Sequence, residues 1–114
     1  MKIENLEEFL NEISREKLLS SEEEQALIKV AQEKGSESEE AERLVKSNLR
    51  FVVSLVKQYQ NRGVSVEELI SIGAEELRKS ILSYDISGDT NFTRHFVELL
   101  RVRFQAAIGK VNEG

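Results

Sequence analysis

An all-α fold, a compact bundle of about five helices, is predicted by three features of the sequence. Apolar residues recur at helical spacing along most of the 114 residues. The chain contains no proline and only six glycines, which suits long, uninterrupted helices. Strand-like alternation of apolar and polar residues is absent. At this length we expect a single domain that folds around one core.

The first two helices are predicted in the N-terminal third. The first is indicated by apolar residues at helical spacing: Ile3, Leu6, Phe9, Leu10 and Ile13. Ser20 or Ser21 is expected to cap the second helix, because a glutamate follows three residues later and completes a capping box. Gly35 is expected to end it.

A helical hairpin over residues 47–84 is expected to be the seed of the core. Ser36 or Ser38 caps its first helix, which carries a broad apolar stripe: Leu44, Val45, Leu49, Val52, Val53, Val56 and Tyr59. Asn61-Arg62-Gly63 is predicted to stop this helix, with Gly63 in the left-handed conformation that a C-cap needs. Ser65 and Glu68 form a capping box that starts the next helix, which we expect to reach Tyr84.

The last helix is predicted after a turn over residues 85–90. Thr90 is expected to be its N-cap. Its apolar residues, at helical spacing, are Phe92, Phe96, Leu99, Leu100, Phe104, Ala107 and Ile108, and the simplest interpretation of this stripe is a core face. Residues 109–114 are expected to fray.

The composition excludes several functional classes. The chain has no cysteine, which excludes disulfides and thiolate metal sites, and its one histidine is His95. A catalytic or metal-binding arrangement needs convergent partners that one histidine scarcely provides, so we expect no enzyme activity, no cofactor and no metal. No apolar run resembles a signal peptide or a membrane span. We therefore expect a cytoplasmic protein with no membrane partner.

The charge is acidic overall and unevenly distributed. The formal net charge of −5 argues against free, non-specific binding of nucleic acid, because affinity for a polyanion depends on lysines and arginines that neutralise phosphates. Residues 1–47 hold thirteen glutamates against seven lysines and arginines. The end of the chain is basic, with Arg94, Arg101, Arg103 and Lys110 against Glu98. If the chain contacts a polyanion, we expect the last helix to do so.

A family resemblance is carried by the central hairpin. Residues 48–73 read NLRFVVSLVKQYQNRGVSVEELISIG and resemble the NLRLVxxxAKxYxNRGLxxxDLIQEG signature of the sigma-70 family, the promoter-specificity subunits of bacterial RNA polymerase. Residues 9–35 are similar to the segment that precedes this signature in the family. The resemblance implies a region 1.2-like part over residues 1–35 and a region 2-like part over 36–110. Since the later family regions are absent from the sequence, we expect it not to be a complete primary sigma factor.

The resemblance implies a polymerase-docking face on the hairpin. In the family this face binds a coiled coil of the largest polymerase subunit. The positions carried over are Leu49, Val52, Glu67, Glu68, Ser71, Ile72 and Arg78. Leu49, Val52 and Glu68 match the family pattern, whereas Ser71 and Ile72 replace a glutamine and a glutamate. Each hydrogen-bonding partner lost from an interface weakens it by about 1–3 kcal/mol if the facing group stays buried, so the implied docking is altered.

The resemblance also implies contact with promoter DNA at the minus-ten element. The positions carried over are Asn48, Tyr84, Asp85, Arg94, His95, Leu99, Arg101 and Arg103. The family's paired tryptophans are Glu98 and Leu99 here, and a lost base–aromatic stack weakens strand capture by roughly 1–3 kcal/mol. Arg94 and Arg103 add cationic groups that the family lacks. The implied DNA contact is therefore weak or altered.

Two hypotheses follow for the function. The first is a small sigma-like transcription protein that docks on the polymerase core and contacts minus-ten DNA weakly. The alternative is a protein-interaction module on a sigma scaffold that no longer binds DNA and acts as a polymerase competitor or as a decoy for a sigma regulator. The missing aromatic residues and the acidity favour the second hypothesis, whereas the added arginines, Asn48 and Tyr84 favour the first.

Overall fold

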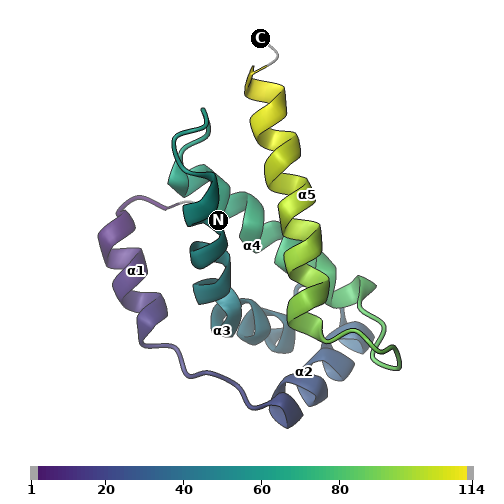
Figure 1. The fold of residues 1–114 in the computed structure, drawn as a ribbon. Coiled ribbons are helices and arrows are strands. Elements are labelled where there is room, and N and C mark those ends of the chain that lie inside the picture. Colours follow the sequence, from purple (N-terminus) through teal and green to yellow (C-terminus); the bar gives the residue numbers. More distant parts are fainter. Residues whose placement is uncertain (1–2, 113–114) are drawn as a thin grey trace.

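The computed structural model describes residues 3–112 and confirms the all-α fold (Figure 1). Within this range the chain forms five α-helices and a short 3₁₀ helix, η1 (Lys57–Tyr59), and it contains no strand. The α-helices are α1 (Leu6–Ser14), α2 (Ser21–Lys34), α3 (Glu39–Val56), α4 (Val66–Ser83) and α5 (Phe92–Asn112).

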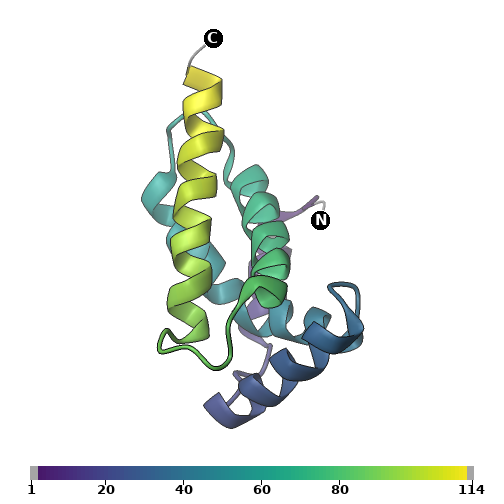
Figure 2. The same cartoon turned by 90° about the vertical axis from the view of Figure 1, so that its right-hand side faces the viewer.

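Helices α3, α4 and α5 form the centre of the bundle. Helix α4 packs against both α3 and α5, and α2 packs across α3 and α4. Helix α1 contacts α3, and in Figure 1 it lies on the other side of α3 from α5. Figure 2 shows that the loop after η1 returns close to the C-terminal end of α5. This arrangement leaves two seams, one between α1 and α3 and one between α3 and α5.

Serine side chains set the starts of three helices. Ser20 forms the complete predicted capping box with Glu23. Ser38, the second of the two predicted candidates, caps α3 by accepting a hydrogen bond from the backbone N–H of Ala41. Ser65 caps α4 in the same way, from the N–H of Glu68. Each serine thus satisfies a backbone donor that has no partner inside its helix.

The start of α5 differs from the prediction. Asn91, and not Thr90, is the cap, because the Asn91 side-chain oxygen accepts a hydrogen bond of 2.8 Å from the N–H of Arg94. The Thr90 carbonyl is used elsewhere and accepts a hydrogen bond from the Tyr84 hydroxyl. The predicted fraying of residues 109–114 is also wrong in part, since α5 continues through Asn112. Residues 113 and 114 lie outside the described range.

The end of α3 is more gradual than predicted. The α-helix ends at Val56 and continues as η1, after which Gln60 is extended. Asn61 and Gly63 both have positive φ angles, of 63° and 102°, which asparagine and glycine tolerate best. The predicted left-handed Gly63 is therefore present, but it lies in the loop beyond the helix end. A Cβ on Gly63 would lie 3.2 Å from a methyl of Val111 in α5.

The core is continuous across the three central helices. Its largest fully buried side chains are Phe92, Phe96, Phe104, Ile28, Leu44, Leu69, Ile70, Leu77, Ile81, Leu100, Val45 and Val52. The aromatic residues of α5 pack edge-to-face or tilted against one another and against Tyr59 and Tyr84. The core interpretation of the α5 stripe is confirmed for its central residues, whereas Leu99 and Ala107 are only half-buried.

None of the helices within residues 3–112 has both the length and the apolar character to cross a lipid bilayer.

Candidate functional site

The two apolar residues assigned to polymerase docking lie in the core. Leu49 is 4% exposed and Val52 is fully buried. Val52 packs against α4 at Gly73, and Leu49 lies at the floor of the hollow between α3 and α1. The hairpin packs as predicted, but it does not display these side chains. The expectation that Leu49 and Val52 form a docking surface is therefore wrong for this structure.

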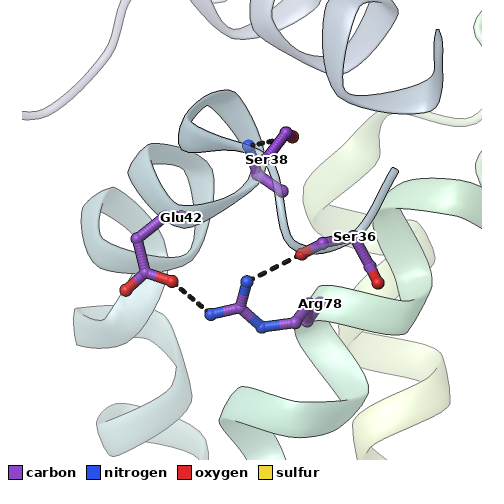
Figure 3. Close-up of polar contacts among 5 residues, drawn as sticks. Ser36, Ser38, Glu42 and Arg78 are labelled. Atoms are coloured by element: carbon purple, nitrogen blue, oxygen red, sulfur yellow. Dashed lines mark hydrogen bonds and ion pairs between the residues drawn. The ribbon is translucent and has the colours of Figure 1, made fainter. Parts of the chain in front are cut away.

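Arg78 is occupied inside the molecule as well. Its guanidinium donates one hydrogen bond to the Ser36 carbonyl, at 2.7 Å, and forms an ion pair with Glu42 (Figure 3). Both partners lie at the start of α3, where Ser38 caps the helix (Figure 3). Arg78 thus joins α4 to the N-terminal end of α3, and this bond network limits its use by a partner.

The other predicted docking residues lie on the outer side of α4. Glu68 is exposed, while Glu67, Ser71 and Ile72 are half-buried. Ile72 packs partly against the core. Glu75 continues the exposed face at helical spacing and pairs with Lys79 at 3.3 Å. The outer face of α4 is therefore polar and is acidic at its N-terminal end. Ile72 is the one apolar residue among the predicted docking positions on this face.

Helices α3 and α5 run side by side in the same direction, and their seam is the second candidate site. The Phe51 and Phe96 rings lie 6.5 Å apart, and further along the Tyr59 and Phe104 rings lie 5.4 Å apart. Phe51 falls off the apolar stripe of α3 and stays 44% exposed. The seam therefore presents an aromatic ring that solvent, or a ligand, can reach.

A polar hollow of about 240 Å³ opens at the N-terminal end of this seam. Asn48, Phe51 and Thr93 line it from α3 and α5, and Glu24 lines it from α2. The Asn48 amide donates a hydrogen bond of 2.8 Å to the Leu44 carbonyl, which fixes its orientation. Asn48, which was predicted to contact DNA, is thus mostly buried. It forms the polar floor of the hollow and is not exposed on the surface.

Glu24 has an altered acidity in this position. Burial raises the pKa of its carboxyl above the ordinary value, and a side-chain hydrogen bond with Asn48 opposes part of that rise. The uncharged form of the carboxyl is therefore favoured relative to an exposed glutamate.

Tyr84 and His95 lie together beside the seam. Their rings are 5.5 Å apart, the Tyr84 hydroxyl is bonded to the Thr90 carbonyl, and His95 Nε2 lies 2.9 Å from the Ser83 hydroxyl. Asp85 is exposed and folds back on Ser87 through two hydrogen bonds, which lower its pKa. Tyr84 is largely buried, so this cluster mainly holds the turn before α5.

The three arginines of α5 do not form one basic surface. Arg94 and Arg101 share a face, because seven residues make nearly two turns, and Arg94 pairs with Glu98 at 3.4 Å on that face. Arg101 donates to Gln58 Oε1 at 3.1 Å and to the Tyr59 hydroxyl at 3.3 Å. Arg103 turns toward α4 instead, with its Nε 4.0 Å from Glu76. The structure therefore brings only Arg94 and Arg101 to the outer face beside the seam.

Within residues 3–112, no three histidine, cysteine, aspartate or glutamate side chains are arranged so that they could hold a metal ion.

Comparison with known proteins finds sequence similarity to RNA polymerase sigma factors. The chain is 34% identical over 83 residues to the RNA polymerase sigma-G factor of Bacillus subtilis strain 168, an alignment that covers 73% of the chain and 32% of that protein. It is 32% identical over 83 residues to the putative RNA polymerase sigma-G factor of Bacillus thuringiensis subsp. kurstaki, of which it covers 65%. No protein-family model matches the chain. The chain therefore spans just under a third of the length of the first relative and just under two thirds of the second.

Both relatives are named as RNA polymerase sigma factors. The resemblance noted on the central hairpin is confirmed: this chain is a divergent relative of the sigma factors of the sigma-70 family, over about 73% of its length.

Sequence reasoning missed three residues of the seams. Phe51 could have been found, because it falls outside the inward positions of the α3 stripe and is a large apolar residue. Glu24 could not have been found from the sequence, since its contact with Asn48 depends on how α2 crosses α3. Arg50 was recognised only as part of the family signature, yet its guanidinium donates to the carbonyls of Ser14 and Glu16 at 2.8 and 2.7 Å and so joins α3 to the end of α1.

Proposed function

We propose that this chain is a sigma-like transcription protein that associates with the RNA polymerase core and makes weak contacts with unpaired minus-ten promoter DNA. The observation that carries the proposal is the 83-residue similarity to sigma-G factors, in a chain whose central hairpin retains the family signature. The geometry of the α3–α5 seam supports the DNA contact, and the outer face of α4 supports the polymerase contact.

The α3–α5 seam offers the groups that an unstacked base requires. Capture of a base outside the helical stack depends on an aromatic face and on hydrogen-bonding groups at the base edge. Phe51 supplies an exposed ring, and Asn48 and Thr93 supply polar groups in the adjoining hollow. Arg101 lies further along the same seam and supplies a cation for a phosphate. Glu98 pairs with Arg94, which keeps the expected affinity low.

The polymerase contact is assigned to the outer face of α4. With Leu49 and Val52 in the core, the predicted docking residues that remain accessible are Glu67, Glu68, Ser71 and Ile72. This face carries carboxylates at its N-terminal end and one half-buried apolar side chain. It suits a partner helix that brings basic residues to the rim and a small apolar contact to Ile72.

DNA contact is tested with a fluorescent single strand of minus-ten sequence, titrated with the chain bound to polymerase core. Replacing Phe51 by serine should weaken the strand affinity by about tenfold, as expected for one base–aromatic stack. Arg101→Gln should weaken it and flatten its salt dependence, since one phosphate contact is lost. Arg43→Gln is the matched control, because Arg43 is exposed on α3 and does not line the hollow.

If the Phe51 and Arg101 variants bound the DNA strand as tightly as the unmodified chain, the DNA part of the proposal would be wrong. If polymerase still co-purifies in that case, the chain is an interaction module on a sigma scaffold, which was the alternative hypothesis.

Polymerase association is tested by co-purification of core subunits with the tagged chain. Glu68→Arg combined with Glu75→Arg should abolish co-purification, because it reverses the charge of the outer α4 face. Glu7→Arg combined with Glu33→Arg makes the same change in net charge on α1 and α2, at exposed positions, and should leave association intact. Retention of the core by a folded Glu68/Glu75 variant would contradict the assignment of this face.

A further inference from the structure

Four glutamates form a row along α1. Glu4, Glu8, Glu12 and Glu16 follow one another at intervals of four residues, in or next to α1, and all four line the same hollow. Like charges at this spacing repel each other on a helix. None of the four takes part in a salt bridge within residues 3–112. The row is therefore a line of negative charge without an ion-pair partner in the described part of the chain.

The hollow beside this row has an apolar floor. It has a volume of about 440 Å³ and lies between α1 and α3. Its apolar lining residues are Ile3, Phe9, Ile13, Val45 and Leu49. Ile3 and Phe9 are only half-buried, so part of the floor remains accessible. Lys46 is the one cationic side chain among the lining residues, and the Glu42 carboxylate beside it is already paired with Arg78.

We propose that the groove between α1 and α3 is a docking site for a basic amphipathic helix of a partner protein. A helix in a groove places apolar side chains at i, i+3, i+4 and i+7 on the floor. Its lysines or arginines flank that stripe and reach the rim with their charged ends, where the four glutamates face them. Charge complementarity of this kind selects a basic partner and increases its rate of association. This site is distinct from both surfaces in the proposed function and does not depend on them.

Helix α5 from a second copy of this chain would be a poorer occupant of the groove. Arg94 is paired with Glu98, and Arg103 lies near Glu76. These contacts would have to be given up before α5 could neutralise the acidic row of another copy. The groove is therefore assigned to a different protein.

The test uses a fluorescein-labelled synthetic helix made of leucine and lysine, with leucines at i, i+3, i+4 and i+7. Its binding to the full chain is followed by fluorescence anisotropy, and its location by shifts of backbone amide signals in ¹⁵N spectra. Tight binding with shifts confined to α1 and the facing part of α3 is the expected result. Glu8→Lys combined with Glu12→Lys should weaken binding by about tenfold or more. Glu7→Lys combined with Glu33→Lys changes the net charge equally, away from the groove, and should weaken it less than twofold.

Three outcomes would overturn the proposal. If both double variants weakened peptide binding equally, the binding would depend on overall charge and not on the glutamate row. Undiminished binding of a peptide whose leucines are replaced by serine would show that the apolar floor has no part in it. Concentration-dependent dimerisation of the chain alone, abolished by the Glu8 and Glu12 replacements, would assign the groove to a second copy.

Discussion

Val52 and Gly73 meet at a point where α4 has no room for a side chain. A Cβ on Gly73 would lie 2.6 Å from Val52 Cγ1 and 3.0 Å from Leu100 Cδ2, both closer than side-chain atoms normally approach. The glycine lets the α4 backbone come against α3 and α5 together. This contact explains why Val52 is core and why a glycine stands in the middle of a helix, where it is otherwise unfavourable.

Replacing Gly73 by alanine is expected to destabilise the fold. Overpacking a buried contact costs about 1–3 kcal/mol, which exceeds the gain of at most about 1 kcal/mol from the better helix propensity of alanine. The free energy of unfolding, from urea titration, should therefore fall by about 1 kcal/mol. Gly109→Ala is the matched control, because nothing lies within 4 Å of a Cβ there, and it should be neutral or stabilising. A Gly73 variant as stable as the Gly109 variant would show that α4 does not pack this closely.

Arg50 is expected to hold α1 on the bundle. Its guanidinium donates to three carbonyls at the C-terminal end of α1 and just beyond it, those of Ile13, Ser14 and Glu16. Removing a charged donor from such a set costs about 1–3 kcal/mol, and α1 has few other contacts to offset the loss. Arg50→Ala should therefore speed amide hydrogen exchange in α1 by one to two orders of magnitude, while exchange in α4 stays unchanged. Arg43→Ala, at an exposed position on the same helix, is the control and should leave amide exchange in both α1 and α4 unchanged. If Arg50→Ala accelerated exchange in all helices equally, the effect would be a global loss of stability and not a release of α1.

The Arg78 contacts with Glu42 and Ser36 should be unequal in strength. The Glu42 side chain is 47% exposed and that of Arg78 is 24% exposed, and exposed ion pairs contribute about 0.2–1 kcal/mol. The Ser36 carbonyl at the start of α3 accepts a charge-assisted bond that nothing else in the described contacts replaces. Arg78→Ala should therefore lower the free energy of unfolding by about 1–2 kcal/mol, and Glu42→Gln by less than half of that. A double-mutant cycle in urea measures the pair directly, and a coupling as large as the whole Arg78 effect would exclude a separate role for Ser36.

Glu24 should make stability depend on pH in the direction opposite to most carboxylates. Because burial raises its pKa in the folded state, the folded chain holds this proton more tightly than the unfolded chain. The contribution of Glu24 is therefore fully present below pH 4.5, the ordinary carboxyl pKa, and is lost as the pH rises through the raised folded-state value. Glu24→Gln should stabilise the fold at pH 7, and its advantage should vanish below pH 4.5.

Thermal unfolding of both proteins across this pH range checks the prediction. Glu22→Gln is the control, because Glu22 lies in the same first turn of α2 but is exposed. An advantage of Glu24→Gln that is constant with pH would show that it comes from packing and not from ionisation.

Local signals in the sequence determined most of the helices. Ser20 with Glu23, Ser65 before Glu68, and Gly35 after α2 are decided by backbone hydrogen bonds within a few residues, so their positions could be predicted from short motifs. The family signature on the hairpin likewise predicted the relationship to sigma factors, because identity at fixed spacing can be compared without knowing the packing. Thr90 is not the cap because α5 begins at Phe92, and the side chain of the preceding Asn91 accepts the hydrogen bond from the N–H of Arg94.

Only the tertiary structure decided which residues face solvent. The family resemblance implied that Leu49 and Val52 are displayed, whereas their place on the apolar stripe indicated a core position. The packing of α3 buries both, with Val52 against α4 and Leu49 beside α1. Arg101 and Arg103 are two residues apart in the sequence, yet they lie beside different helices, because each residue advances the helix by about 100°. The acidic groove, the hollow at Asn48 and the occupied Arg78 all arise from residues distant in the chain. Burial and charge pairing depend on contacts between residues far apart in the chain. Short sequence motifs do not encode such contacts, so they could not be predicted from a single sequence.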